Sequence, residues 1–175
     1  MRIIAGSRKG ARIFAPKGRE TRPTSDRARE AAFNLIGPVE GARVLDLFAG
    51  SGAMGLEALS RGAASAVFVE ADRDAHRTIE RNLDKLDLTG ARLVNSDALR
   101  FLATDTGTYD LVLCDPPYGA YEALRPTLER YLPPRLSPHA VVVLETPARD
   151  PEPELALPLR TSRRYGAARI TLWQP

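Results

Sequence analysis

The stretch from Val44 to Ala63, VLDLFAGSGAMGLEALSRGA, constrains the fold more than any other part of the sequence. It begins with an apolar run of strand length, turns at Gly50 and Gly52, and continues with apolar residues at helical spacing. Glycine adopts backbone angles that other residues avoid and lets a ligand approach the main chain. The stretch therefore predicts a buried strand, a ligand-binding turn and a helix that packs closely at Gly55.

Strands and helices alternate along the rest of the chain. Apolar runs of strand length occur at AVFVE, ARLVN, YDLVLC and AVVVLE, and helical patterns lie near residues 53–61, 74–86 and 121–132, with a shorter one after Asp97. This alternation predicts an α/β fold with a mostly parallel sheet that is covered on both faces. The final pair of strands, LRTSRRYG and AARITLW, turns near Tyr165 and Gly166. A chain of 175 residues is the size of one domain with a single core.

The residues Asp115-Pro116-Pro117-Tyr118 follow the predicted strand YDLVLC. The two prolines make the segment stiff and extended, so the carbonyl of Pro116 keeps one direction. Ionised Asp115 offers only acceptors, and Tyr118 offers a flat face on which a planar base can stack. The segment predicts a clamp for an amino group, with Asp115, Pro116 and Tyr118 as candidate catalytic residues. The same residues also suit a strand that ends in a surface turn.

The glycine turn is open to two interpretations. G-S-G-A-M-G also satisfies the dinucleotide-binding pattern, and Glu70 at the end of the next strand suits the ribose of an adenine nucleotide in either case. Asp46 favours S-adenosyl-L-methionine, because a carboxylate attracts its ammonium and sulfonium groups but repels a pyrophosphate. Asp46 alternatively braces the loop or caps the helix. Acids follow successive strands at Glu70, Asp97 and Asp115, and these strand ends form the edge where ligands bind.

With these motifs in place, the chain resembles class I methyltransferases, and most specifically the bacterial 16S ribosomal RNA guanine-N2 methyltransferases. The resemblance covers nearly the whole chain and also rests on the segments RIIAGSRKG, RPTSDRAREAAFNLI and YGAARITLW. It implies a Rossmann-like fold with a mostly parallel seven-stranded sheet, an antiparallel last strand, and a small amino-terminal hairpin and helix. The tail from Asp150 to Pro158 is richer in proline than this family's, which puts only a surface connection in doubt.

The resemblance implies methyl transfer from S-adenosyl-L-methionine to the exocyclic N2 of one guanine, position 966 in the family's usual numbering. The product of the cofactor would be S-adenosyl-L-homocysteine. The resemblance places Glu70 on the ribose hydroxyls and Asp97 on the adenine amino group. Adenine-N6 and protein glutamine-N5 methyltransferases share the DPPY clamp and remain alternatives. The expected cofactor-binding residues are Asp46, Phe48, Gly50, Ser51, Gly52, Glu70, Asp97, Ala98 and Asp115.

The basic residues gather at the amino terminus. Residues 1–30 contain nine Lys or Arg and three acids, a net charge of +6, whereas the rest of the chain has a net charge of −3. Such an excess suits a phosphate backbone, although a solvated basic extension is the alternative. We expect residues 1–40 to form an RNA-facing extension, with RIIA and ARIF as a hairpin and Thr24 or Ser25 capping a helix that begins near Asp26. Residues 41–175 would form the methyltransferase domain. The candidate RNA-binding residues are Arg8, Lys9, Arg12, Arg22, Arg27 and Arg29.

Other site chemistries find little support in the sequence. Cys114 is the only cysteine, and it precedes Asp-Pro-Pro, whereas the thiolate of cytosine-C5 methyltransferases follows its proline, so a buried strand residue is favoured. His76 and His139 stand apart, so no metal site is predicted. Without a secretory segment or an apolar run of about 20 residues, we expect a cytoplasmic monomer that acts on 16S rRNA in an assembling or assembled small subunit. A nicotinamide oxidoreductase and a noncatalytic RNA-binding protein remain rival classes.

Overall fold

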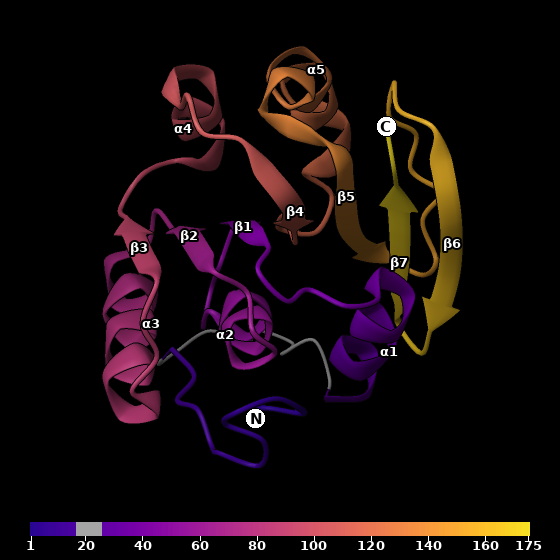
Figure 1. Cartoon of the computed structure of the whole chain (residues 1–175). Coiled ribbons are helices and arrows are strands. Elements are labelled where there is room, and N and C mark those ends of the chain that lie inside the picture. Colours follow the sequence, from indigo (N-terminus) through magenta and orange to yellow (C-terminus); the bar gives the residue numbers. More distant parts are fainter. Residues whose placement is uncertain (17–25) are drawn as a thin grey trace.

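A seven-stranded sheet forms the centre of the molecule, and the computed structural model describes residues 1–16 and 26–175 around it (Figure 1). The strand order is β3-β2-β1-β4-β5-β7-β6, and only β7 runs antiparallel to its neighbours β5 and β6. The predicted Rossmann-like α/β fold with an antiparallel last strand is thereby confirmed. The strands are β1 (Arg43–Leu47), β2 (Ser65–Val69), β3 (Ala91–Val94), β4 (Tyr109–Cys114), β5 (Leu136–Pro147), β6 (Leu159–Tyr165) and β7 (Ala168–Trp173).

Helices cover both faces of the sheet. Helices α1, α2 and α3 lie on one face and α4 and α5 on the other, as Figure 1 shows below and above the sheet. The side chains of Asp72 and Asp97 accept backbone N–H groups at the starts of α3 and α4, which explains where those helices begin. The helices are α1 (Asp26–Ile36), α2 (Ala53–Ser60), α3 (Arg73–Leu86), α4 (Ala98–Thr104) and α5 (Tyr121–Tyr131), followed by the short 3-10 helix η1 (Pro133–Arg135).

The sheet separates two apolar clusters. Val44 packs into the cluster on the α1–α3 face, whereas the next residue, Leu45, packs into the cluster on the α4–α5 face. Successive residues of a strand point to opposite faces, so a central strand that is buried on both sides has to be apolar throughout. This explains the continuous apolar run that leads into the glycine turn.

The amino-terminal arm, residues 1–16, pairs with itself less extensively than the sequence predicted. Instead of two strands there is one antiparallel bridge between Arg2 and Arg12. The pairing stops because the N–H groups of Ile4 and Ala5 donate to the carboxylate of Glu57 on α2 rather than across the hairpin.

The arm is packed as part of the domain. Ile3 and Ile13 belong to the apolar cluster on the α1–α3 face, in which Leu56 of α2 also lies. A boundary at residues 40 and 41 therefore stays a prediction. Helix α1 begins at Asp26 as predicted, while the proposed cap at Thr24 or Ser25 lies outside the described residues.

Candidate active site

The glycine turn and the DPPY segment begin side by side at the middle of the sheet. Strand β1 lies between β2 and β4, so the chain order reverses here, and ligands of such sheets bind outside the carboxyl ends of the strands at this point. Leu47, the last residue of β1, pairs with Cys114, the last residue of β4. The N–H of Asp115 also donates to the carbonyl of Leu47 at 3.5 Å. Both predicted motifs therefore begin at the same edge of the sheet, at neighbouring strand ends.

The turn after β1 has the backbone geometry of a ligand-binding loop. Phe48, Gly50 and Gly52 have φ angles of 60°, 56° and 78°, in the left-handed region that costs a non-glycine residue such as Phe48 conformational energy. The N–H of Gly50 donates to one carboxylate oxygen of Glu70 at 2.8 Å, and the N–H of Asp72 donates to the other at 2.8 Å. A carboxylate has about four acceptor positions, so Glu70 can hold the turn and still accept ligand hydroxyls.

Asp46 lies beneath this turn with 3% of its surface exposed. Its Oδ2 atom accepts the N–H of Gly55 at 2.9 Å, so the bracing role that the sequence left open is present. Burial raises the pKa of Asp46 to about 7. The hydrogen bond from Gly55 lowers this pKa, and the charge of Glu70 raises it by less than burial does. A cation bound nearby would favour the ionised form, so this carboxyl can respond to a positively charged ligand near neutral pH.

Gly55 allows the close packing that the sequence predicted. A Cβ atom at this position would lie 2.3 Å from a ring carbon of Phe68 and 2.9 Å from Oδ2 of Asp46. Any side chain here would therefore push α2 away from β1 and β2. The position of the helix, and with it the shape of the glycine turn, depends on this residue.

Asp97 and Ala98 lie at the end of β3, next to β2. The Oδ1 atom of Asp97 accepts the N–H groups of Leu99 and Arg100, both at 3.0 Å, so this acid caps α4. Asp97 is exposed and Ala98 is buried. Both residues lie at the edge of the sheet that carries Glu70, and their contact with a cofactor stays a prediction.

A cavity of about 230 Å³ opens beside the DPPY segment. It is lined by Pro116, Tyr118, Tyr121 and Glu145, and by Asp150, Pro151 and Pro153 of the proline-rich tail. Tyr118 is 51% exposed, which leaves its ring available for stacking. The cavity is smaller than the roughly 300–1,000 Å³ of sites for drug-sized ligands. The proline-rich tail is thus part of this site, not only a surface connection.

Asp115 is close to a second carboxylate. Cys114 pairs with Leu144 in the parallel β4–β5 register, which brings the next residues, Asp115 and Glu145, together at the sheet edge. Burial raises the pKa of Asp115 well above its ordinary value, and the charges of Glu145 and then Asp46 raise it further. This concentration of acceptors favours ligands that carry positive charge or N–H groups.

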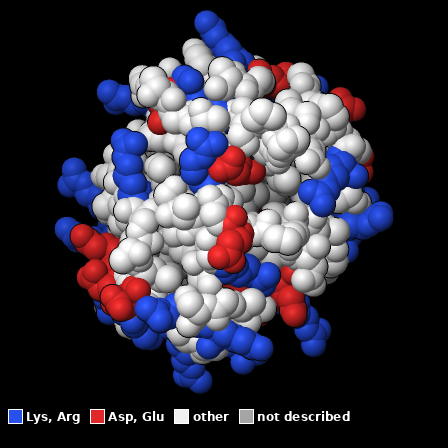
Figure 2. All heavy atoms as spheres, viewed as in Figure 1, with Lys and Arg blue, Asp and Glu red and all other residues white. Residues whose placement is uncertain are grey.

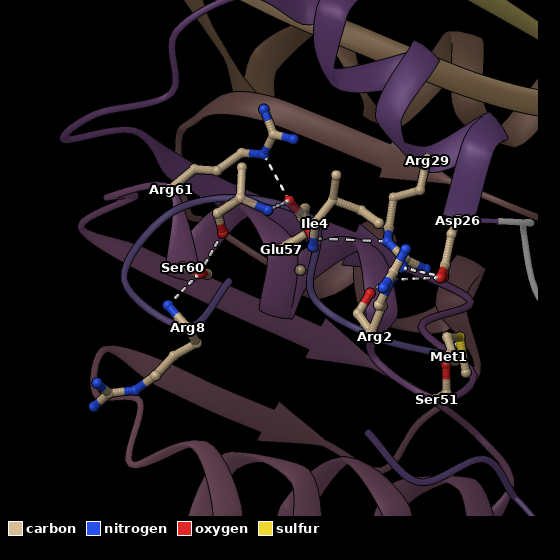
Figure 3. A network of polar contacts seen from close by, with 12 residues as sticks. Met1, Arg2, Ile4, Arg8, Asp26, Arg29, Ser51, Glu57, Ser60 and Arg61 are labelled. Atoms are coloured by element: carbon tan, nitrogen blue, oxygen red, sulfur yellow. Dashed lines mark hydrogen bonds and ion pairs between the residues drawn. The ribbon is translucent and has the colours of Figure 1, made fainter. Parts of the chain in front are cut away.

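Glu57 of α2, the helix after the glycine turn, binds the amino-terminal arm (Figure 3). This fully buried carboxylate accepts the N–H of Ile4 at 2.8 Å, the N–H of Ala5 at 2.9 Å and Nε of Arg61 at 2.7 Å. Its Oε2 atom also lies 3.7 Å from Nε of Arg29. A carboxylate in the otherwise apolar α2 sequence was the available signal for this role, which was not predicted.

The prediction that Arg29 faces RNA is wrong. Its side chain is fully buried, and its Nη2 atom donates to Oδ1 of Asp26 at 2.8 Å and to the carbonyl of Arg2. The guanidinium lies inside because Glu57 and Asp26 compensate its charge there. Arg29 lies at helical spacing from Ala32, Phe33 and Ile36, and this spacing was the available signal that its face turns inward.

Other basic residues of the arm remain at the surface. Figure 2 shows Lys and Arg side chains at the bottom of the face, over the arm, and also around the rest of the outline. Lys9, Arg12 and Arg27 are exposed. Arg8 is partly buried, and its Nη2 donates to the carbonyl of Asp87 at 2.9 Å, just past the carboxyl end of α3, where a cation is favourable. Arg22 lies outside the described residues.

Asn82 joins the arm to the glycine turn and was not predicted. This fully buried side chain of α3 donates from Nδ2 to the carbonyls of Phe14 at 3.0 Å and Ser51 at 3.1 Å. Its Oδ1 accepts the N–H of Phe14 at 2.7 Å. Ser51 in turn lies with Oγ 3.8 Å from the sulfur of Met1. An uncharged polar residue on the apolar side of the α3 pattern was the signal for this contact.

Cys114 does not have the properties of a nucleophile. Its side chain is 5% exposed, and burial raises the pKa of the thiol above its ordinary value, with smaller contributions from Asp115 and Asp46. Within residues 1–16 and 26–175, no group of three or more His, Cys, Asp or Glu side chains is arranged to hold a metal ion. In the same residues no helix is long and apolar enough to cross a bilayer.

Comparison with known proteins agrees with the fold and the motifs. The family model described as Conserved hypothetical protein 95 matches residues 1–174. Ribosomal RNA small subunit methyltransferase D of Escherichia coli (strain K12) is 46% identical over 119 residues, which span 67% of this chain and 60% of that protein. A solved structure of the Escherichia coli protein yhhF is 37% identical, with a TM-score of 0.87 over 99% of this chain and 97% of the other.

A more distant structure shares the fold. It is an RNA methyltransferase from Salinibacter ruber in complex with S-adenosyl-L-homocysteine, 18% identical, with a TM-score of 0.67 over 87% of this chain and 92% of the other. The family match over nearly the whole chain, together with the Escherichia coli relatives, confirms the resemblance stated from the sequence. The chain belongs to the Conserved hypothetical protein 95 family, together with the bacterial ribosomal RNA small subunit methyltransferases D.

Proposed function

We propose that this protein transfers a methyl group from S-adenosyl-L-methionine to the exocyclic N2 of one guanine in 16S ribosomal RNA, position 966 in the family's usual numbering. The observation that carries the proposal is the pairing of Leu47 with Cys114. This pairing places the start of the glycine turn beside the start of the DPPY segment. A methyl donor bound at the turn would therefore lie next to a base bound at DPPY. The relatives named for methylation of small-subunit rRNA support the class of substrate.

The residues of the β1 turn fit this cofactor better than a dinucleotide. S-adenosyl-L-methionine supplies an electrophilic methyl group on a sulfonium ion. Asp46 and Glu70 would attract its positive charges, whereas they would repel a pyrophosphate. Gly50 and Gly52 have the left-handed backbone that lets a ligand approach the main chain. Asp97 and Ala98 would border the adenine ring, and Phe48 and Ser51 would complete the wall of the site.

The DPPY residues would orient the base for direct in-line transfer. The lone pair of the guanine amino group is delocalised into the ring, so this amine is a poor nucleophile until its hydrogens are held. Asp115 and the Pro116 carbonyl would accept those hydrogens while Tyr118 stacks on the ring, so that orientation is the main catalytic device. After transfer the nitrogen is cationic and acidic, and it loses a proton to Asp115 or to water. No covalent enzyme intermediate is required.

The RNA would reach the cavity beside DPPY across the basic arm. Lys9, Arg12 and Arg27 are exposed and would contact phosphates, together with the exposed part of Arg8. The N2 amino group is accessible only in an unpaired or flipped guanine, which favours a loop over a duplex. We expect a cytoplasmic monomer that acts on 16S rRNA within an assembling or assembled small subunit.

Two variants separate the proposed roles. Asp115→Ala should abolish methyl transfer and leave the affinity for S-adenosyl-L-methionine nearly unchanged, because Asp115 acts on the base. Glu70→Ala should weaken that affinity first, because Glu70 holds both the turn and the ribose. Calorimetric titration of the cofactor and incorporation of labelled methyl into small subunits measure the two effects, with exposed Glu80→Ala as the control. Equal loss of cofactor binding in both variants would refute the assignment.

A further inference from the structure

A second carboxylate faces the cavity from the strand next to DPPY. Asp115 and Glu145 directly follow the paired residues Cys114 and Leu144, on parallel strands that lie about 4.8 Å apart. Glu145 lines the cavity of about 230 Å³ together with Pro116 and Tyr118. Its neighbours in β5, Leu144 and Thr146, are buried, whereas Glu145 is partly exposed. The carboxylate of Glu145 therefore lies beside Asp115 and Pro116 and not in the apolar core.

The position of this acceptor matters because guanine and adenine differ next to their amino groups. Guanine presents N1–H beside its 2-amino group, so two neighbouring positions donate. Adenine presents a lone pair at N1 beside its 6-amino group. The clamp of Asp115 and the Pro116 carbonyl holds an amino group of either base, but a carboxylate beside it attracts an N1–H and repels an N1 lone pair. Reading a flipped base through this edge is a common device of enzymes that modify bases.

We propose that Glu145 selects guanine by accepting the N1–H of the base whose 2-amino group Asp115 holds. The inference rests on the proposed function and deepens it by naming the residue that reads the base. It gives the shared DPPY clamp a partner that distinguishes a guanine-N2 enzyme from an adenine-N6 enzyme. Glu145 is then a specificity residue and not the acceptor of the leaving proton.

The test compares guanine with 2-aminopurine at the target position of reconstituted small subunits. 2-Aminopurine keeps the 2-amino group but has a lone pair at N1. The wild-type protein should prefer guanine by roughly 100-fold or more in kcat/KM, because a site built to accept a hydrogen bond rejects an analogue that lacks the donor.

Glu145→Gln should reduce that preference at least about tenfold, because its amide N–H can donate to the N1 lone pair. Glu145→Asp keeps an acceptor and should retain most of the preference. Glu122→Gln changes another carboxylate of the cavity wall and should leave the ratio unchanged. Unchanged affinity for S-adenosyl-L-methionine verifies that each variant is folded.

The possible results distinguish a failure of the proposed role of Glu145 from a failure of the proposed function. If Glu145→Gln methylates guanine N2 with the wild-type preference over 2-aminopurine, the role of Glu145 is overturned while the proposed function stands. If the wild-type protein methylates no guanine N2 in these subunits, the proposed function itself fails. A preference that falls equally in Glu145→Gln and Glu122→Gln also overturns the inference, because it would reflect the charge of the cavity and not a contact with N1.

Discussion

The Oδ2 atom of Asp46 accepts the backbone N–H of Gly55 at 2.9 Å and so joins the end of β1 to the first turn of α2. The bond spans the glycine turn, and it forms only because Gly55 has no side chain to hold the helix away. The same carboxyl has a pKa raised to about 7. One contact therefore links the packing of α2, the shape of the turn and the charge beneath the proposed cofactor.

Gly55→Ala tests the packing role. The added methyl would lie 2.3 Å from the Phe68 ring, so we expect a loss of about 1–3 kcal/mol in unfolding free energy, together with weaker cofactor binding because the turn shifts. Urea unfolding and calorimetric titration measure the two effects. Gly166→Ala is the control: its φ of 60° strains an alanine without a clash, because a Cβ there has nothing within 4 Å, and the position lies in the β6–β7 turn. Gly166→Ala should lose unfolding free energy without losing cofactor affinity. If Gly55→Ala also keeps its cofactor affinity, the link between Gly55 packing and the shape of the turn is contradicted.

Asp46→Asn tests the charge beneath the cofactor. Below pH 7 Asp46 is protonated in the free protein, so binding of the cofactor should release a proton. The affinity for the cofactor should therefore fall by up to about tenfold per pH unit as the pH decreases below 7. Titration in buffers of different ionisation enthalpy measures the proton release. The variant should bind more weakly at pH 8 and release no proton from this site. Equal proton release by both proteins at pH 6.5 would show that another group is responsible.

The same variant should change the pH dependence of stability. The folded pKa of Asp46, about 7, lies above its unfolded value of about 3.9, so the folded state binds this proton more tightly. The stability that Asp46 contributes is therefore present below about pH 4 and is lost as the pH rises to 7. Asp46→Asn keeps an acceptor for Gly55 without the charge, so its Tm relative to wild type should be higher at pH 8 than at pH 5. A Tm difference that does not change with pH would contradict this.

Glu57→Ala should be among the most destabilising single changes in the arm contacts. It removes the acceptor of Ile4 and Ala5 and leaves Arg29 buried beside Asp26 alone, which typically costs about 3–5 kcal/mol. Denaturant unfolding measures the loss, and hydrogen exchange should show that the amides of Ile4 and Ala5 lose protection. Exposed Glu80→Ala should stay within about 0.5 kcal/mol of wild type. A similarly small change for Glu57→Ala would mean that the arm does not depend on this carboxylate.

The exposed cations of the arm should control the salt dependence of RNA binding. Lys9→Ala and Arg12→Ala should each weaken binding to small-subunit RNA and reduce the slope of log K against log salt by about 1 if each contacts a phosphate. Filter binding across a salt series measures the slopes. Arg130→Ala, on α5 at the opposite face of the sheet, is the matched control. Slopes that match the wild type in both arm variants would remove the arm from the interface.

The sequence predicted those features that depend on local pattern. Runs such as YDLVLC and the spacing of the α3 residues follow from burial in a two-sided sheet, so strands and helices fell close to their observed bounds. Acids at strand ends were recognised because parallel strands bring Glu70 and Asp115 to one edge. The close packing at Gly55 was predicted because no other residue fits a tight strand–turn–helix unit.

The missed features depend on contacts between distant segments. Arg29 looked like an RNA ligand because the sequence does not show that Glu57, 28 positions away in α2, draws it inside. The hairpin was expected to pair fully because the sequence does not show that Ile4 and Ala5 have a stronger acceptor in Glu57. Glu145 ends the predicted strand AVVVLE, whereas β5 continues to Pro147, and its place beside DPPY becomes visible only from the β4–β5 register.

The most direct test of the central claim is to incubate unmethylated small ribosomal subunits with this protein and S-adenosyl-L-methionine, and then to map the modified nucleotide by mass spectrometry of digested 16S rRNA. We expect N2-methylguanosine at a single position, and none with the Asp115→Ala protein. Methyl incorporation at adenine N6 or at a protein glutamine, or N2-methylguanosine made equally by Asp115→Ala, would contradict it.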